Sequence, residues 1–110
     1  MPYPRVDDDG QTVTLDLHGA PVEEAVALAK RLVHEAARRG RHTVKLVHGQ
    51  STSSRLHQNR TIKNALYDLL DQGTLGSGIT HAWRADGYLL LSLDVTASAD
   101  PTPIRLLDVS

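Results

Sequence analysis

The stretch Leu15–Gly19 (Leu-Asp-Leu-His-Gly) ends an apolar, strand-like run, and Lys45–Gly49 (Lys-Leu-Val-His-Gly) ends a second run in the same way. A helical pattern follows each of them. The two histidines, His18 and His48, are 30 residues apart (48 − 18), which is about the span of one strand–helix–strand unit. If the two strands are parallel neighbours, both His-Gly pairs lie beyond their carboxyl ends, where open α/β sheets usually bind ligands. We expect the functional site at that edge.

Length and composition indicate one small domain without cysteine. A chain of 110 residues has room for a single domain, which buries roughly two-thirds of the surface of its unfolded form. The absence of cysteine excludes disulfides and thiolate metal sites. No apolar run approaches the ~18 residues of a membrane span, and the acidic start at 7–9 is unlike a secretory signal. We therefore expect a cytoplasmic protein without membrane association, either a monomer or a weak oligomer.

The charge is nearly balanced overall but unevenly distributed. The formal net charge is −1, yet the stretch from Lys30 to Lys63 holds nine Lys and Arg against one acid, Glu35, which gives +8 there and −9 elsewhere. This asymmetry favours a phosphate-bearing partner, although a solvated helix surface would also explain it. With one Trp, three Tyr and no Phe, platforms for base stacking are poorly supplied. We expect any nucleic acid to be held by its backbone and shape.

The spacing of apolar residues predicts four strands and two helices. The strands are expected over residues 12–18, 43–47, 79–84 and 88–95, and the helices over 21–39 and from an N-cap at Asn59 to Gly73. A strand, a helix and a second strand form a right-handed unit, so the first two strands should be parallel. The last strand is apolar on both faces at Leu89–Leu91, which suits a central position.

This order predicts an α/β domain of the two-layer α+β type, βαβαββ, in which two helices cover one face of a four-stranded mixed sheet. The opposite face, which carries Thr12, Thr14 and Asp16, is expected to be open. Trp83 is expected to pack in the core or on a sheet face rather than to serve as a platform for base stacking. We assign residues 12–95 to the domain, 1–11 to a flexible N-terminal tail and 96–110 to a C-terminal tail.

These features resemble the Smr (small MutS-related) domain family. The likeness rests on Leu15–Gly19, on His48-Gly49 at the second strand end, and on Ile62-Lys63, Leu66 and Leu70 in the second helix. It covers most of the chain. The resemblance implies a fold like that of the C-terminal domain of bacterial translation initiation factor three, and it implies nucleic-acid binding. For several family members it also implies endonuclease activity on DNA or RNA.

Within that resemblance, Asp16 and His18 match the first family motif, and His48 and Gly49 match the start of the second. The family usually has His-Gly-x-Gly where this chain has His48-Gly49-Gln50-Ser51. The missing glycine makes a close approach of backbone to phosphate harder. This departure bears on catalysis more than on binding.

The expected site combines groups suited to a phosphodiester. The first helix begins soon after Gly19, and its free N–H groups and dipole favour an anion there. His18 and His48 titrate near neutrality, so that one can serve as general base and the other as general acid, each role contributing ~10²–10⁴-fold. Asp16 shares a strand face with His18 and can orient an imidazole or hold a divalent cation such as magnesium. Spacing alone leaves metal-free and metal-assisted cleavage open, and it predicts no zinc site.

We assign Asp16, His18 and His48 as candidate catalytic residues. The candidate nucleic-acid-binding residues are Gly19, Gly49, Gln50, Ser51, Arg55, Arg60 and Lys63. Their basic members would position the backbone rather than specify a sequence. Three arginines near the other end of the first helix are expected to serve its dipole and solubility: Arg38, Arg39 and Arg41.

Three functions remain open from the sequence. The first is an Smr-type endonuclease, and the second is a nucleic-acid-binding module without chemistry. The third is a nucleotide or other small phosphate ligand at the same edge. A strand-terminal His-Gly is also common as a plain turn in which the imidazole bonds a backbone carbonyl, and Asp16 could simply cap nearby N–H groups.

Overall fold

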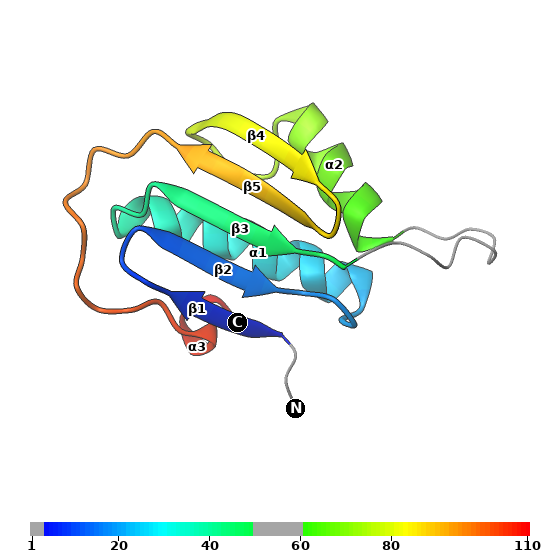
Figure 1. Cartoon of the computed structure of the whole chain (residues 1–110), viewed down its shortest axis with the longest axis horizontal. Helices are drawn as coiled ribbons and strands as arrows, with labels where there is room; N and C mark the ends of the chain where they lie inside the picture. The colour runs from blue at the N-terminus through cyan, green and yellow to red at the C-terminus, as the bar shows by residue number, and fades with distance from the viewer. Residues whose placement is uncertain (1–3, 50–60) are drawn as a thin grey trace.

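One mixed sheet organises the molecule in a computed structural model that describes residues 4–49 and 61–110 (Figure 1). Its strands are β1 (Arg5–Asp8), β2 (Thr12–Asp16), β3 (Thr43–Val47), β4 (Ile79–Ala85) and β5 (Tyr88–Leu93). The helices are α1 (Val22–Arg38), α2 (Ile62–Gln72) and α3 (Leu106–Val109). The strand order is β1-β2-β3-β5-β4, with β2 and β3 parallel and every other neighbouring pair antiparallel. The predicted parallel pair and the central place of β5 are both confirmed.

The helices lie on one face of this sheet, and Figure 1 views the molecule from the other face, with α1 behind the strands. Burial alternates along β2, β3 and β5, because successive side chains of a strand point to opposite faces. The buried sheet residues are Val13, Leu15, Val44, Leu46, Leu89, Leu91 and Leu93. They pack against the apolar side of α1, whose buried residues are Ala25, Leu28, Ala29, Leu32, Val33 and Ala36. No described helix covers the second face, which agrees with the expected open face.

The fifth strand, β1, corrects the predicted four-stranded sheet. Residues 5–8 were expected in a flexible tail, but Arg5 pairs with Asp16 and Asp8 with Val13, antiparallel to β2. The reason is a buried ion pair. The Arg41 guanidinium lies 2.8 Å from Asp8 Oδ1, and the two side chains are only 1% and 0% exposed. The expectation that Arg41 is a surface residue is therefore wrong.

The C-terminal segment also docks on the domain, in a third helix that the sequence did not predict. The backbone N–H of Ile104 donates to Asp8 Oδ2 at 2.7 Å, and Arg41 Nη2 donates to the Thr102 carbonyl at 3.1 Å. Ile104 and Val109 are almost fully buried in the core. The Asp8–Arg41 pair thus joins the first strand, the end of α1 and the C-terminal segment.

Two further predictions concern α2 and the last hairpin. The N-cap of α2 is Thr61, whose side chain accepts from the Asn64 N–H at 3.1 Å, whereas the expected cap, Asn59, lies outside the described residues. Gly73 ends the helix with φ 74, as predicted, because a left-handed conformation is easiest for glycine. The strands β4 and β5 pair as an antiparallel hairpin.

Within residues 4–49 and 61–110, no helix combines the length and the apolar character that a membrane crossing needs.

Candidate functional site

The two His-Gly motifs meet at one edge of the sheet. Because β2 and β3 are parallel and in register, with Asp16 opposite Val47, both chains leave the sheet in the same direction. The Leu17 N–H donates to the Val47 carbonyl at 2.8 Å, which extends the pairing beyond β2. A Cβ placed on Gly49 would lie 2.9 Å from the Cβ of His18, and Gly49 has φ +78. Only a glycine fits there without displacing His18, so the second motif packs directly against the first.

Asp16 and His18 form a close carboxylate–imidazole pair. His18 Nδ1 lies 2.6 Å from Asp16 Oδ1, and the backbone N–H of His18 donates to the same oxygen at 3.2 Å. The pair is accessible, since 45% of the His18 side chain and 20% of the Asp16 side chain are exposed. A carboxylate at Nδ1 favours the neutral tautomer with its proton on that nitrogen, and Nε2 is then the proton acceptor. This is the arrangement of an oriented general base.

His48 lies in a different environment, because its ring is buried. Its Nδ1 donates to the Gly49 carbonyl at 2.8 Å, and the ring meets the Tyr67 ring edge-on with 6.1 Å between centroids. Its Nε2 is buried without a hydrogen-bond partner in the part of the chain that the structure describes. Burial lowers the pKa of His48, and the nearby charge of Lys63 lowers it further, against the backbone hydrogen bond to Gly49. His48 is therefore neutral at pH 7. Its proton lies on Nδ1, which bonds a backbone carbonyl as expected for a plain His-Gly turn.

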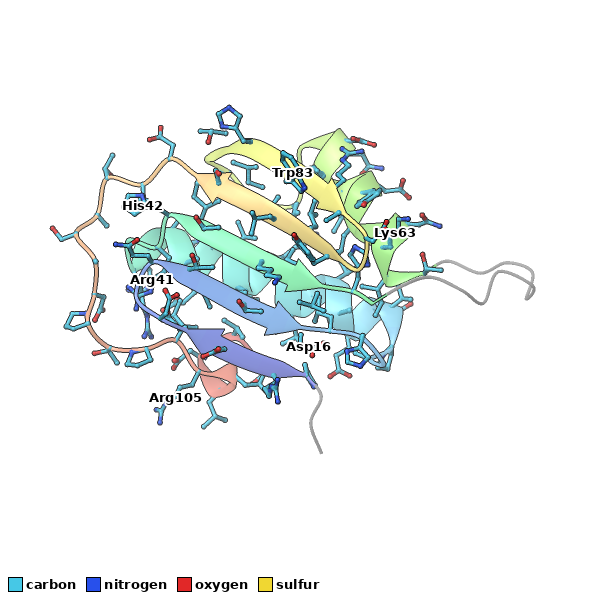
Figure 2. All side chains as sticks on the ribbon, viewed as in Figure 1. Asp16, Arg41, His42, Lys63, Trp83 and Arg105 are labelled. Carbon is cyan, nitrogen blue, oxygen red and sulfur yellow. The ribbon has the colours of Figure 1, made fainter. Side chains whose placement is uncertain are left out.

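Tyr67 is the centre of a cluster that sequence reasoning missed. Lys63 Nζ lies 5.7 Å from its ring centroid, and Arg84 Cζ lies 4.8 Å away. Arg84 is also paired with Asp71 at 2.7 Å. Lys63 and Tyr67 are one helical turn apart, which could have been noticed, but the approach of Arg84 depends on how β4 packs against α2. In Figure 2, Lys63 and Asp16 both lie toward the end of the sheet at which β2 and β3 end.

The start of α1 offers an anion a mixed environment. Gly19 precedes it with φ +88, and no described side chain caps the first turn, whose N-cap is Pro21. Its N–H groups and dipole favour an anion. Glu23 and Glu24 occupy the same turn and are exposed, so their negative charge opposes a phosphate. The helix start alone is therefore a weaker phosphate site than the sequence suggested.

Four of the sequence-predicted binding residues lie outside the described residues: Gln50, Ser51, Arg55 and Arg60. Among residues 4–49 and 61–110, no three His, Cys, Asp or Glu side chains converge as a metal site would require. Magnesium is usually held by one or two carboxylates together with water and phosphate oxygens, and Asp16, which is partly exposed at this edge, is a candidate carboxylate for that role.

Comparisons with known proteins agree with this arrangement. Searches of curated proteins and of solved structures found no match. The family described as Smr domain matches residues 15–88, a range that begins at the first motif and ends in β5. Domains of this family generally bind nucleic acids, and some members are endonucleases. Since the match spans both motifs and most of the sheet, the chain belongs to the Smr domain family.

Proposed function

We propose that this Smr domain binds DNA or RNA and cleaves its phosphodiester backbone at the Asp16–His18 pair. The observation that carries the proposal is the 2.6 Å contact between His18 Nδ1 and Asp16 Oδ1, in a pair that stays accessible at the edge of the sheet. A buried pair with the same geometry would only stabilise the fold. An accessible one can meet a substrate that approaches from solution.

The proposed chemistry uses His18 as general base and Asp16 as the group that orients it. Nε2 of His18 takes the proton of the attacking oxygen, which is a water or, in RNA, the neighbouring 2′-hydroxyl. That oxygen forms a bond to phosphorus, the bond to the leaving oxygen breaks, and the leaving oxygen takes a proton from solvent. A general base of this kind typically contributes ~10²–10⁴-fold. If a divalent cation such as magnesium takes part, Asp16 is its proposed ligand, and the cation would offset charge on the phosphate.

The remaining residues are proposed to hold the backbone. Gly49 gives the chain a close approach beside His18, and Lys63 supplies a positive charge in the first turn of α2. Gly19 and four residues from the stretch of sequence after Gly49 complete the proposed binding set: Gln50, Ser51, Arg55 and Arg60. Such contacts position a nucleic acid without reading its sequence.

His48 is proposed as a positioning residue rather than as the general acid. Its ring is buried and burial lowers its pKa, so the imidazole is neutral at pH 7 and lacks the acidic proton of an imidazolium. Its bond to the Gly49 carbonyl fixes the turn that packs against His18.

The same burial favours a second candidate function, which is nucleic-acid binding without cleavage. With His48 inside, His18 is the one imidazole of the two motifs that is exposed to a substrate. The sequence Gln50-Ser51, where the family usually has a glycine, points in the same direction.

Cleavage assays separate the two functions. Purified protein is incubated with single-stranded, duplex and branched RNA and DNA, with and without a chelator, beside the variants His18→Ala and Asp16→Asn. His34→Ala is the matched control, since His34 is an exposed histidine on α1. We expect His18→Ala to lower the rate by at least about 100-fold, the lower end of the range for a general base. The control should cut at the wild-type rate.

The outcomes are distinct. Cleavage that survives His18→Ala would refute the proposed site, because the activity would then come from elsewhere. Tight binding without any cutting would select the binding module. Loss of cleavage in the presence of the chelator would indicate a metal-assisted reaction, and unchanged cleavage would indicate a metal-free one.

A further inference from the structure

The open face of the sheet is ordered in rows, which follow from the strand register. The first row lies at the end of the sheet where β2 and β3 end, beside the two His-Gly motifs. It consists of one residue from each strand: Arg5, Asp16, Val47, Tyr88 and Ala85. The next row is Asp7, Thr14, Lys45, Leu90 and Trp83. A third row is Thr12, Thr43, Ser92 and His81. Because the alternate residues of β2, β3 and β5 are buried under the helices, these side chains share the uncovered face.

Trp83 is the large apolar side chain that this face exposes to solvent. It is 67% exposed, and among the described residues only Leu107, on α3, is a comparably exposed large apolar side chain. Figure 2 shows Trp83 on β4, in front of the sheet rather than between the sheet and α2. It lies opposite Leu90 in the register. The expectation that Trp83 packs in the core or on a sheet face is therefore right only in its second part, and the ring is left open to a partner.

The surroundings of Trp83 are polar and carry one central cation. Lys45 Nζ lies 4.4 Å from the centroid of the Tyr88 ring, so the cation sits over that aromatic face in the middle of the sheet. The face also carries the hydroxyl groups of Thr12, Thr14, Thr43 and Ser92, together with two carboxylates, Asp7 and Asp16. Hydroxyl groups and lysine are common partners of phosphate and sugar oxygens. The face has too few aliphatic side chains to resemble the apolar core of a protein–protein interface.

The face also leads directly to the candidate catalytic pair. Asp16 lies in the first row on β2, and Tyr88 lies in the same row on β5, two strands away. Trp83 lies in the second row on β4, which is the strand next to β5. At ~4.8 Å between neighbouring strands, Trp83 lies about 14 Å across the sheet from β2. A strand of a few nucleotides can span that distance. A duplex cannot present a base to Trp83, because its bases are already stacked on each other.

We propose that the open face binds a single-stranded segment of nucleic acid, with one base stacked on Trp83 and the backbone passing Lys45 toward Asp16 and His18. This inference rests on the proposed function and adds the class of substrate to it. The stacking site requires no particular base, because every base has an aromatic face. It also implies that a duplex binds this face less well than a single strand does.

The test uses the fact that Trp83 is the single tryptophan of the chain, so tryptophan fluorescence reports on this position alone. The full chain is titrated with an oligouridylate, an oligothymidylate and a duplex. The titration is repeated in the His18→Ala variant so that cutting does not consume the probe. We expect the single strands to quench the fluorescence saturably, with the same midpoint as binding measured by anisotropy of a labelled oligonucleotide. The duplex should quench little.

Affinity measurements on variants complete the test. Alanine replacement of a stacking aromatic weakens single-strand binding by about 5- to 150-fold, and we expect Trp83→Ala to fall in that range. Trp83→Phe should recover part of the loss, since it restores an aromatic face. Leu107→Ala is the matched control, because it removes a comparably exposed apolar side chain from α3. It should bind as the wild type does.

The results separate this inference from the proposed function. If the wild type binds single strands but Trp83→Ala binds them equally well and the fluorescence does not change, the stacking site is refuted and the proposed function stands. If the wild type binds no nucleic acid, both fail. If size-exclusion chromatography shows a dimer that Trp83→Ala dissociates while binding is unaffected, the face is a self-association surface and the inference is overturned.

Discussion

Replacing Asp8 with alanine is expected to destabilise the domain by about 3–5 kcal/mol, the cost of breaking a buried ion pair by removing one partner. Asp8 accepts from Arg41 Nε and Nη2, both at 2.8 Å, and from the Ile104 N–H at 2.7 Å. Without the carboxylate, a guanidinium that is 1% exposed keeps its charge without a counter-ion, and a buried N–H loses its acceptor. A domain of this size has a total stability of about 5–15 kcal/mol, so the loss is a large fraction of it.

Urea unfolding at pH 7, followed by circular dichroism, measures the effect. Asp7→Ala is the matched control, because Asp7 neighbours Asp8 on β1 but is exposed, and it should change stability by less than about 0.5 kcal/mol. The double variant Asp8→Leu/Arg41→Met should recover most of the loss, because both charges leave the core together. An Asp8→Ala protein that unfolds within about 1 kcal/mol of the wild type would refute the account of why β1 joins the sheet.

The pH dependence of the same pair has a defined direction. Burial raises the pKa of Asp8, but the hydrogen bonds from Arg41, Ile104 and Gly10 together outweigh it, and the pKa falls below its ordinary value of 3.8. The carboxylate's contribution to stability is therefore complete above about pH 3.8 and is lost as the pH falls through the lower, folded value.

Three further predictions concern the site and α2. Gly49→Ala should lose about 1–2 kcal/mol to its left-handed backbone and also displace His18, so it should impair cleavage or binding. Gly73→Ala is the control, because Gly73 has a similar φ but open space around it. This variant should lose the same stability and keep its function. Equal function in both variants would contradict the proposed contact between Gly49 and His18. Because burial lowers the pKa of His48 in the folded protein, the imidazole is protonated at a higher pH in the unfolded chain than in the folded one. The wild type should then lose stability as the pH falls below 6.5, by at most about 1.4 kcal/mol per pH unit, and His48→Gln should flatten that slope between pH 7 and 5 in urea titrations. Thr61→Ala should cost about 0.5–2 kcal/mol by removing the cap of α2, and an unchanged unfolding midpoint would show that the cap is not needed.

The elements that carry strong local signals could be predicted from the sequence. Alternation along Thr12–Leu17 and the helical spacing over Val22–Arg38 depend on neighbouring residues alone, so they survive in the structure with their boundaries nearly intact. The parallel pairing follows from the short connections of a strand–helix–strand unit. From that pairing alone, the meeting of the two His-Gly motifs at one edge could be expected.

The features that the sequence did not reveal depend on contacts between distant residues. The strand β1 has a single apolar side chain, Val6, and its place in the sheet depends on Asp8 and Arg41, which are far apart in the chain. The helix α3 has four residues, too few for a periodic signal. His18 and His48 follow the same local pattern, yet one ring is exposed and the other is buried against Tyr67, because only the second meets α2.

The direction of β1 has a practical consequence for protein engineering. Because β1 is antiparallel to β2, it begins beside Asp16, at the edge that holds the candidate catalytic pair. A purification tag or fusion partner attached at the amino terminus would emerge next to that pair and compete with a substrate for access. Any such tag should therefore be removed before the assays of this domain.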